Sequence, residues 1–342
     1  MKPARLCVLL LAFLWVPGKV NANIAVLLQE PYSYDGALAG TGHTAVYLTR
    51  VCAASPTSLQ RCDEGEHGVV ISRYNRIGGY DWIAIPLIPY LYAVTKVENI
   101  PIYADREIVA FLRDQYRREN MQELAPADPS GQAPGVNWGQ LVGSAYNRTS
   151  FAYEIETTAQ QDDELIRWLN SRPNRALYRV LSRNCADFVR DIVNFYYPKA
   201  VSRSIVVDFG ITTPKRVAKS IAKYSQRHPD LEFVSLVIPQ VPGTVRRSKP
   251  VRGIVESVLK AKKYVIPLAI FQPYAAGGLA LAYLVDGHFK PDKCAMSFNL
   301  DSTVVSPLTG DERYAYRRDL DELPRAFDAP VAVETNWEVK SR

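Results

Sequence analysis

Alternating apolar and polar residues predict several short strands in the first half of the chain. A repeat of two is typical of a strand with one buried face. This repeat covers Thr44 to Val51 and Gly68 to Tyr74, which we expect to pair as an antiparallel hairpin. Apolar runs predict further strands over Asn23 to Leu28, Phe151 to Thr157 and Leu177 to Leu181.

Apolar residues spaced three and four apart predict helices between and after these strands. We expect amphipathic helices over Asp105 to Asn120 and Asp162 to Asn170, and a further helix that begins at Cys185 and stops at Pro198. The stretch from Asp81 to Val94 is aromatic and contains prolines, so we expect it to cover the core or to form one wall of a cleft. Strands mixed with helices in this order predict an α+β fold.

Residues 1–22 have the form of a secretory signal. Lys2 and Arg5 make a basic start, and Leu6 to Val16 is an apolar run too short to span a bilayer comfortably. Small residues at 20–22 offer a cleavage site. We therefore expect a mature protein that begins near Asn23 and is periplasmic or secreted.

The composition is that of a globular protein, with 47% apolar and 22% charged residues. The roughly 320 residues left after cleavage suit one large domain or two smaller ones. We divide them into a domain at 23–198 and a basic, partly apolar extension at 199–342. The net charge of +6 does not indicate a nucleic-acid partner, because export separates the protein from nucleic acid.

The cysteines divide into a structural pair and a chemical candidate. Cys52 and Cys62 close a short loop between two predicted strands, and an oxidising compartment favours a disulfide there. Cys185 would then be free for chemistry. For Cys294 two interpretations stay open: a buried structural thiol, or a bridge to Cys185 that would abolish catalysis.

The predicted helix start at Cys185 carries the main chemical signal. Unpaired N–H groups and the positive end of the helix dipole meet there, and both favour a thiolate over a thiol. His43, at the start of a separate strand, is the natural base. Each residue alone also has an ordinary explanation, as a packed thiol and as a hydrogen-bonded core histidine.

Three motifs suggest a family: GHTAVYL at 42–48, SRYNRIGGYDW at 72–82 and NCADF at 184–188. They resemble the circularly permuted papain-like thiol hydrolases, relatives of the NlpC-type cell-wall peptidases and of the lecithin-retinol acyltransferase group. More narrowly, they are similar to the Lnb-type N-terminal periplasmic domain family. The resemblance covers about residues 25–198, and the histidine precedes the cysteine, which is the permuted order. It implies an antiparallel sheet packed on the helix that bears the cysteine.

The resemblance also implies roles for single residues. Cys185 would be the nucleophile and His43 its base, with the backbone N–H groups of Cys185 and Ala186 as donors to the oxyanion. The third, orienting residue is expected on the next strand. If Cys52 faces Cys62, the register sets Ile71 or Ser72 opposite His43, and a shifted register would offer His67 or Asn75 instead.

None of the three candidate orienters is a carboxylate, so this sequence departs from a clear family pattern at the third position. Other signals of catalysis are missing: the chain has no Gly-x-Ser-x-Gly, no HExxH, no P-loop and no dinucleotide-binding glycine motif. We therefore expect no cofactor. His228 and His288 have no ligand partners nearby in sequence, so we expect no metal.

The chain after Pro198 is basic and then apolar. A helix opened by Thr213 and Pro214 carries Lys215, Arg216, Lys219, Lys223 and Arg227. The stretch from Tyr264 to Val285 has no charged residue, but prolines and a glycine pair favour a buried or membrane-contacting segment over a span. Residues 213–285 thus predict contact with an anionic membrane, and a solvated helix face is the alternative.

The sequence as a whole predicts an exported cysteine-dependent hydrolase or acyltransferase. It would act on an amide or ester bond of a cell-envelope peptide, a lipoprotein or a lipid. The alternative is a non-catalytic envelope module that keeps the fold and holds a membrane or protein partner.

Overall fold

The computed structural model describes residues 22–32, 39–75, 77–126, 136–291 and 296–297. Its centre is a seven-stranded sheet in the order β6-β5-β2-β1-β7-β8-β9, antiparallel except for the pair β8 and β9. The expected α+β class with an antiparallel sheet is confirmed. The strands are β1 (Ala22–Gln29), β2 (His43–Leu48), β5 (Val69–Ser72), β6 (Ile83–Pro86), β7 (Ser150–Thr157), β8 (Phe233–Ile238) and β9 (Met296–Ser297).

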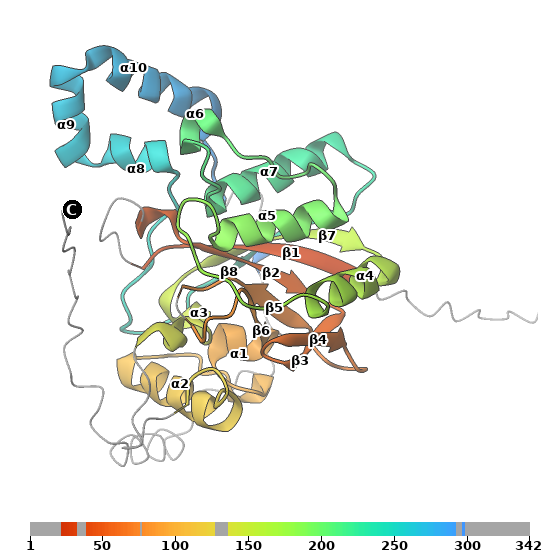
Figure 1. The fold of residues 1–342 in the computed structure, drawn as a ribbon. Coiled ribbons are helices and arrows are strands. Elements are labelled where there is room, and N and C mark those ends of the chain that lie inside the picture. Colours follow the sequence, from red (N-terminus) through yellow and green to blue (C-terminus); the bar gives the residue numbers. More distant parts are fainter. Residues whose placement is uncertain (1–21, 33–38, 76, 127–135, 292–295, 298–342) are drawn as a thin grey trace, which may run out of the picture.

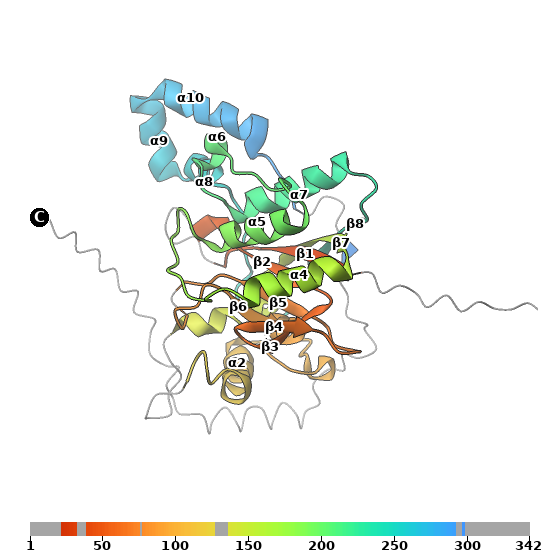
Figure 2. The ribbon, with the colours of Figure 1, turned by 45° about the vertical axis from the view of Figure 1, so that its right-hand side comes forward.

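Helices cover both faces of the sheet, as Figures 1 and 2 show. Alternate residues of β2 divide between two cores: Val46 packs in the core under α5, and Ala45 in the core under α1. One face carries α4 (Ala159–Asn170), α5 (Cys185–Tyr196) and α7 (Pro214–Arg227), and the other carries α1 (Leu87–Tyr92), α2 (Arg106–Asn120) and α3 (Ser144–Asn147).

The predicted helices are confirmed, and side-chain caps explain where they begin. Asp105 accepts a hydrogen bond from the N–H of Ile108 and starts α2. A capping box between Thr158 and Gln161 starts α4 a few residues before the expected Asp162. Short 3₁₀ turns lie at Ala39–Thr41, Val97–Asn99 and Val136–Gln140.

The prediction of a strand over Leu177 to Leu181 is wrong. These residues belong to a loop between α4 and α5, and the side chains of Leu177, Val180 and Leu181 are 78%, 47% and 62% exposed. An isolated bridge between Arg179 and Arg183 closes the loop on itself. The apolar run therefore finds no sheet edge to join.

The disulfide between Cys52 and Cys62 is confirmed, with the two Cα atoms 4.8 Å apart. The register inferred from it is wrong, however. The chain between β2 and β5 forms a separate two-stranded sheet with a bulge, in which Cys52 lies opposite Gln60. Val46 pairs with Ile71, and continuing this register places Tyr74, not Ile71 or Ser72, opposite His43. The two added strands are β3 (Val51–Ser55) and β4 (Ser58–Arg61).

The chain after residue 198 adds to the same sheet and then projects from it. β8 pairs with β7, and α7 packs on the face that carries α5. Short helices from before and after α7 form an outlying group at one end of the molecule (Figure 1). They are α6 (Ile205–Asp208), α8 (Ile254–Lys260), α9 (Lys262–Phe271), α10 (Pro273–Ala282) and the π-helical turn η4 (Tyr283–Gly287).

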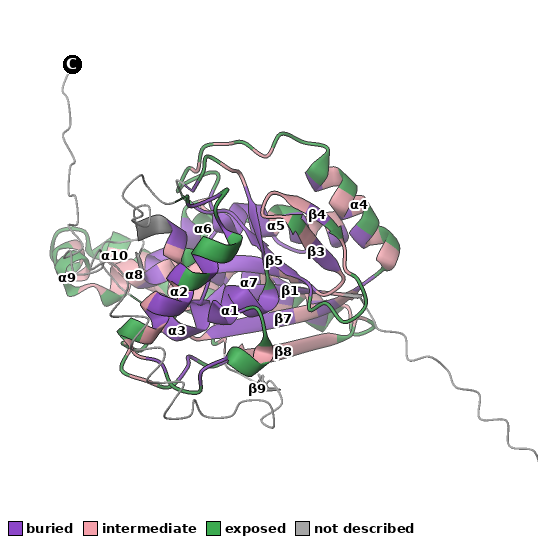
Figure 3. Ribbon diagram, turned by 90° about the horizontal axis from the view of Figure 1, so that it is seen from below, coloured by how far each residue is buried: buried purple, intermediate pink, exposed green. Residues whose placement is uncertain are grey.

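Burial of the stretch from Tyr264 to Val285 is contradicted, because no residue of α9 or α10 is buried (Figure 3). Within the described ranges, no helix combines the length and the apolar character needed to cross a membrane. Residues 1–21 of the expected signal and Cys294 lie outside the described residues.

Candidate active site

Cys185 is the first residue of α5, and its neighbours fix the helix start there. The side chain of Asn184 accepts a hydrogen bond from the N–H of Asp187 at 2.9 Å, and the carboxylate of Asp187 accepts one from the N–H of Asn184 at 3.3 Å. This capping box satisfies two N–H groups that a helix start would otherwise leave unpaired. The remaining free N–H groups are those around the cysteine.

The sulfur of Cys185 is buried, with 6% of the residue exposed. The backbone N–H groups of Thr44, Ala186 and Cys185 itself lie within hydrogen-bonding reach of Sγ, as does the hydroxyl of Tyr178. The contact with Thr44 brings the sulfur to the end of β2, one residue from His43.

The expectation of a thiolate in the resting protein is wrong. Burial raises the pKa of the Cys185 thiol above its ordinary value, and the N–H groups and the Tyr178 hydroxyl, which lower the pKa, do not offset it. The helix start therefore surrounds a protonated thiol at neutral pH.

His43 begins β2 directly after a glycine that the fold requires. Gly42 has a φ of +69°, and a Cβ there would lie 2.1 Å from the carbonyl oxygen of Gln29 on β1. The imidazole stacks on Tyr74 with ring centroids 5.0 Å apart. Its Nε2 lies 3.0 Å from Oγ of Ser72.

The imidazole is neutral at physiological pH. Burial, followed by the positive charge of Arg148, lowers the pKa of His43 to about 3. At neutral pH the site therefore holds a neutral thiol and a neutral imidazole.

Of the three candidate orienters, only Ser72 contacts the imidazole. Its hydroxyl is fully buried, whereas His67 and Asn75 are exposed. The carbonyl of His67 accepts a hydrogen bond from Tyr47 instead. Ser72 reaches His43 diagonally across the sheet, while Tyr74 occupies the opposite position.

Hydrogen-bonded polar side chains from α1, β1 and β7 lie near His43. The hydroxyl of Tyr90 donates to Oε1 of Gln29 at 3.0 Å, and Nε2 of Gln29 donates to Ser150 at 3.2 Å. Gln29 lies opposite both His43 and Ser150 in the sheet register. Burial raises the pKa values of Tyr74 and Tyr90, so both rings keep their hydroxyl protons.

Sequence reasoning missed Tyr178, Tyr90, Gln29 and Arg148. Gln29 could have been found, because it is the polar end of an apolar strand that pairs with the strand of His43. The other three reach the site from a loop, a helix and a helix end, and no spacing in the sequence connects them to Cys185.

Two residues of the motif at 72–82 make ion pairs and hydrogen bonds that fix the start of α5. Arg73 forms an ion pair with Asp81 at 2.7 Å and donates to the carbonyl of Asn184 at 3.2 Å. Arg183 pairs with Asp81 at 2.9 Å from the other side. Although burial opposes it, the hydrogen bonds from Arg183 and Arg73 keep the pKa of Asp81 below its ordinary value. This carboxylate is therefore engaged with arginines and not with His43.

In the described part of the chain, the only cluster of metal-ligating groups is Cys52, Cys62 and Glu66. Both sulfur atoms are consumed by the disulfide, so the cluster is no ligand set.

Comparisons with protein-family models, with curated proteins and with solved structures found no match.

Proposed function

We propose that the protein is a cysteine-dependent hydrolase or acyltransferase with a permuted papain-like core, in which Cys185 is the nucleophile and His43 its base. The supporting observation is the surrounding of Cys185: a sulfur at a helix start, met by three backbone N–H groups, one residue along from a histidine held by Ser72. Such a group of side chains serves acyl transfer better than it serves packing.

The proposed reaction starts from the neutral pair. His43 takes the proton of the Cys185 thiol, and the sulfur attacks the carbonyl carbon of an amide or ester. The N–H groups of Cys185 and Ala186 donate to the tetrahedral oxyanion. The imidazolium returns the proton to the leaving amine or alcohol, which departs and leaves a thioester on Cys185. Water, or another acceptor in an acyl transfer, then attacks the thioester as His43 removes its proton. The C–S bond breaks, the acyl product leaves, and the imidazolium returns the proton to the sulfur of Cys185.

A model ester tests this proposal without knowledge of the natural substrate. Release of p-nitrophenol from p-nitrophenyl acetate should fall by about a hundredfold in Cys185→Ser and in His43→Ala, since nucleophile and base are each lost. Cys294→Ser is the matched thiol control and should keep the wild-type rate. Unchanged hydrolysis in both active-site variants would instead favour the non-catalytic envelope module.

We also propose that the outlying helices bind a lipid surface. Their apolar side chains face solvent: Ile270, Phe271 and Tyr274 are 66%, 76% and 95% exposed, and Ile205 and Phe209 of the neighbouring α6 are 79% and 55% exposed. α6 and α10 are in contact, so these side chains form one apolar end of the molecule. We call α6, α9 and α10 the apolar arm.

A bilayer fits this surface better than a protein groove does. A groove covers one face of a helix, but no residue on any face of α9 or α10 is buried. Each of these helices has 10 residues and is about 15 Å long, which suits one leaflet of a hydrocarbon core roughly 30 Å thick. Lys262 and Lys263 begin α9, where anionic headgroups would meet them, whereas Lys260 pairs with Glu256 at 2.6 Å.

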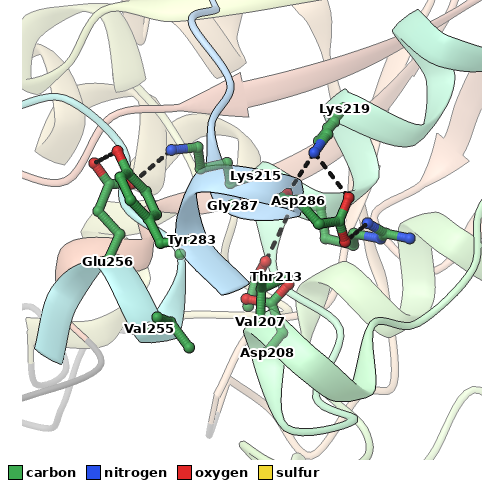
Figure 4. A pocket seen from close by; sticks show the side chains of 12 residues that line it. Val207, Asp208, Thr213, Lys215, Lys219, Val255, Glu256, Tyr283, Asp286 and Gly287 are labelled. Atoms are coloured by element: carbon green, nitrogen blue, oxygen red, sulfur yellow. Dashed lines mark hydrogen bonds and ion pairs between the residues drawn. The ribbon is translucent and has the colours of Figure 1, made fainter. Parts of the chain in front are cut away.

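The basic helix α7 contributes less to this surface than its sequence suggests. Lys215 pairs with the buried Glu256 of α8 at 2.5 Å, and Arg216 and Lys219 pair with Asp286 at 2.8 and 2.9 Å (Figure 4). These three cations fasten α8 and η4, the elements on either side of α9 and α10, to α7. Lys223 and Arg227, for which no such ion pair is formed with the described residues, remain for an anionic partner.

The arm and the proposed catalytic cysteine are on connected parts of the fold. Asn184, the residue before Cys185, donates a hydrogen bond to the carbonyl of Thr212 in the loop that joins α6 to α7. A membrane under the arm would thus lie on the side of the helix start, which favours a lipid or lipoprotein as the substrate over a soluble peptide.

A further inference from the structure

A buried arginine lies beside the candidate active site, and it forms no ion pair with any residue that the structure describes. Arg148 follows α3 and precedes β7, and only 8% of it is exposed. Its guanidinium lies over the ring of Tyr32, 4.8 Å from the ring centroid. Its Nε has no hydrogen-bond partner, and no carboxylate among the described residues forms an ion pair with Arg148.

The sheet register puts Arg148 at the same end of the sheet as His43. Two residues further along, Ser150 lies opposite Gln29, which in turn lies opposite His43. The charge of Arg148 acts on the imidazole and on the hydroxyls of Tyr74 and Tyr90, each of whose pKa it lowers. The guanidinium therefore lies near enough to the proposed base to act on it electrostatically.

Other buried arginines of the protein are paired. Arg73 binds Asp81 at 2.7 Å, and Arg117 binds Asp114 at 2.9 Å. The buried Arg113, near Arg148, donates to the carbonyls of Val142 and Gly143. Among the described residues Arg148 has neither kind of partner, although a buried charge is unfavourable when it is unpaired. Such a cost is offset when an anion binds.

We propose that Arg148 binds an anionic group of the substrate, a phosphate or a carboxylate, next to the bond that Cys185 attacks. The inference rests on the proposed function, since it assigns the substrate class of the same site. Guanidinium groups suit these anions because they offer a planar fork of N–H donors. A phospholipid headgroup and a peptide carboxylate are two sources of this chemistry.

Two alkylating reagents of matched shape test the proposal. Iodoacetate carries a carboxylate and iodoacetamide a neutral amide, and both modify a cysteine at the same carbon. We expect the ratio of their rates at Cys185, measured at pH 7.5 by peptide mass spectrometry, to exceed that of free glutathione. In Arg148→Gln the ratio should fall by about tenfold, and Arg148→Lys should restore part of it.

The change that Arg148→Gln makes to the pKa of His43 acts against the predicted fall in the ratio. Removing Arg148 removes a charge that lowers the pKa of His43, so more imidazolium would form and would attract iodoacetate. This effect opposes the predicted fall and cannot produce it. Arg167→Gln, an exposed arginine on α4, is the matched control and should leave the ratio unchanged.

The outcomes separate the two proposals. A wild-type ratio equal to that of glutathione overturns the anion site without any variant, even if Arg148→Gln fails to fold. A ratio that Arg148→Gln leaves unchanged also overturns it, while ester hydrolysis by Cys185 stands. Failure of both reagents to modify Cys185 overturns the reactive thiol itself, and the anion site with it.

Anionic compounds that protect Cys185 from alkylation identify the source of the anion. Dihexanoyl phosphatidylglycerol that slows alkylation of the wild type, but not of Arg148→Gln, identifies a lipid headgroup. The same pattern with N-acetyl-alanine identifies a peptide carboxylate. If neither compound protects at millimolar concentration, Arg148 does not recognise such anions and the proposal fails.

Discussion

The hydroxyl of Ser72 lies 3.0 Å from Nε2 of His43 and 2.8 Å from the carbonyl oxygen of Thr44. A hydroxyl has one proton, and the carbonyl can only accept. Ser72 therefore donates to Thr44 and accepts from the ring, so His43 carries its proton on Nε2 and keeps a free lone pair on Nδ1. Nδ1 is then the nitrogen that can take the proton of a thiol.

Replacing Ser72 by alanine should remove the hydrogen bond that favours this tautomer of His43. We expect kcat for p-nitrophenyl acetate to fall by about tenfold in Ser72→Ala, with a smaller change in KM, because the ring loses its orienting partner but not its basicity. Ser171→Ala, at the exposed end of α4, is the control. A wild-type kcat in Ser72→Ala would show that Tyr74 stacking alone holds the ring.

The depressed pKa of His43 predicts loss of stability in acid. The pKa is about 3 in the folded protein and 6.5 as the ordinary value, so between these values the unfolded chain binds more protons. The free energy of unfolding should therefore fall as the pH drops from about 6.5 towards 3. Because His43 is only half-buried, we expect on the order of 2 kcal/mol.

Urea unfolding at several pH values measures this slope. His43→Gln, which stays neutral, should flatten the slope over that pH window, whereas His67→Gln, an exposed histidine, should not. Equal slopes in His43→Gln and the wild type would mean that the imidazole is already protonated in the folded protein.

The raised pKa of Cys185 predicts the pH profile of its alkylation. Iodoacetamide reacts with the thiolate, so its rate at Cys185 should still be rising above the ordinary thiol pKa of 9.0. The groups facing the sulfur are the N–H groups of Thr44 and Ala186 and the hydroxyls of Tyr178 and Tyr74, none of which carries a charge at neutral pH. A rate plateau between about pH 5 and 7 would instead reveal a preformed thiolate–imidazolium pair.

Local patterns predicted most of the sheet and the helix that carries the cysteine. The two-residue repeat located β2 and β5, and the apolar spacing after Cys185 located α5. Leu177 to Leu181 was misjudged because an apolar run also fits an exposed loop when no sheet edge is near. Its inward residue, Tyr178, reaches Cys185 through a fold that no local pattern describes.

The strand register around His43 shows why the site needed the structure. The disulfide prediction was correct, but β3, β4 and the bulge in their pairing lie between β2 and the strand of Ser72. Counting from the disulfide therefore set the wrong residue opposite His43. Arg148 could not be identified as a site residue from the sequence, for a related reason. A buried charge without a partner is recognised only when all its neighbours are known.

The disulfide should stabilise the fold without taking part in the chemistry. Cys52 and Cys62 are separated by 10 positions, and opening this loop by the double change Cys52→Ala, Cys62→Ala should lower the free energy of unfolding by about 2 to 3 kcal/mol. Calorimetry of the variant measures the change. Ester hydrolysis per folded molecule should stay at the wild-type level, and its loss would mean that the β3–β4 sheet positions His43.

The apolar arm predicts binding to anionic vesicles. We expect the full chain to float with phosphatidylglycerol vesicles in a density gradient. The change Ile270→Asp, Phe271→Asp should weaken binding by at least about tenfold, because it removes two apolar side chains that the lipid would cover and adds charge. Ile102→Asp, which alters an exposed apolar residue outside the arm, is the matched control. A tryptophan at the 95% exposed position, Tyr274→Trp, should shift its emission to shorter wavelength when vesicles are added. Flotation that survives the double change with no emission shift would place the contact elsewhere, and lack of flotation by the wild type would remove the lipid surface as a partner.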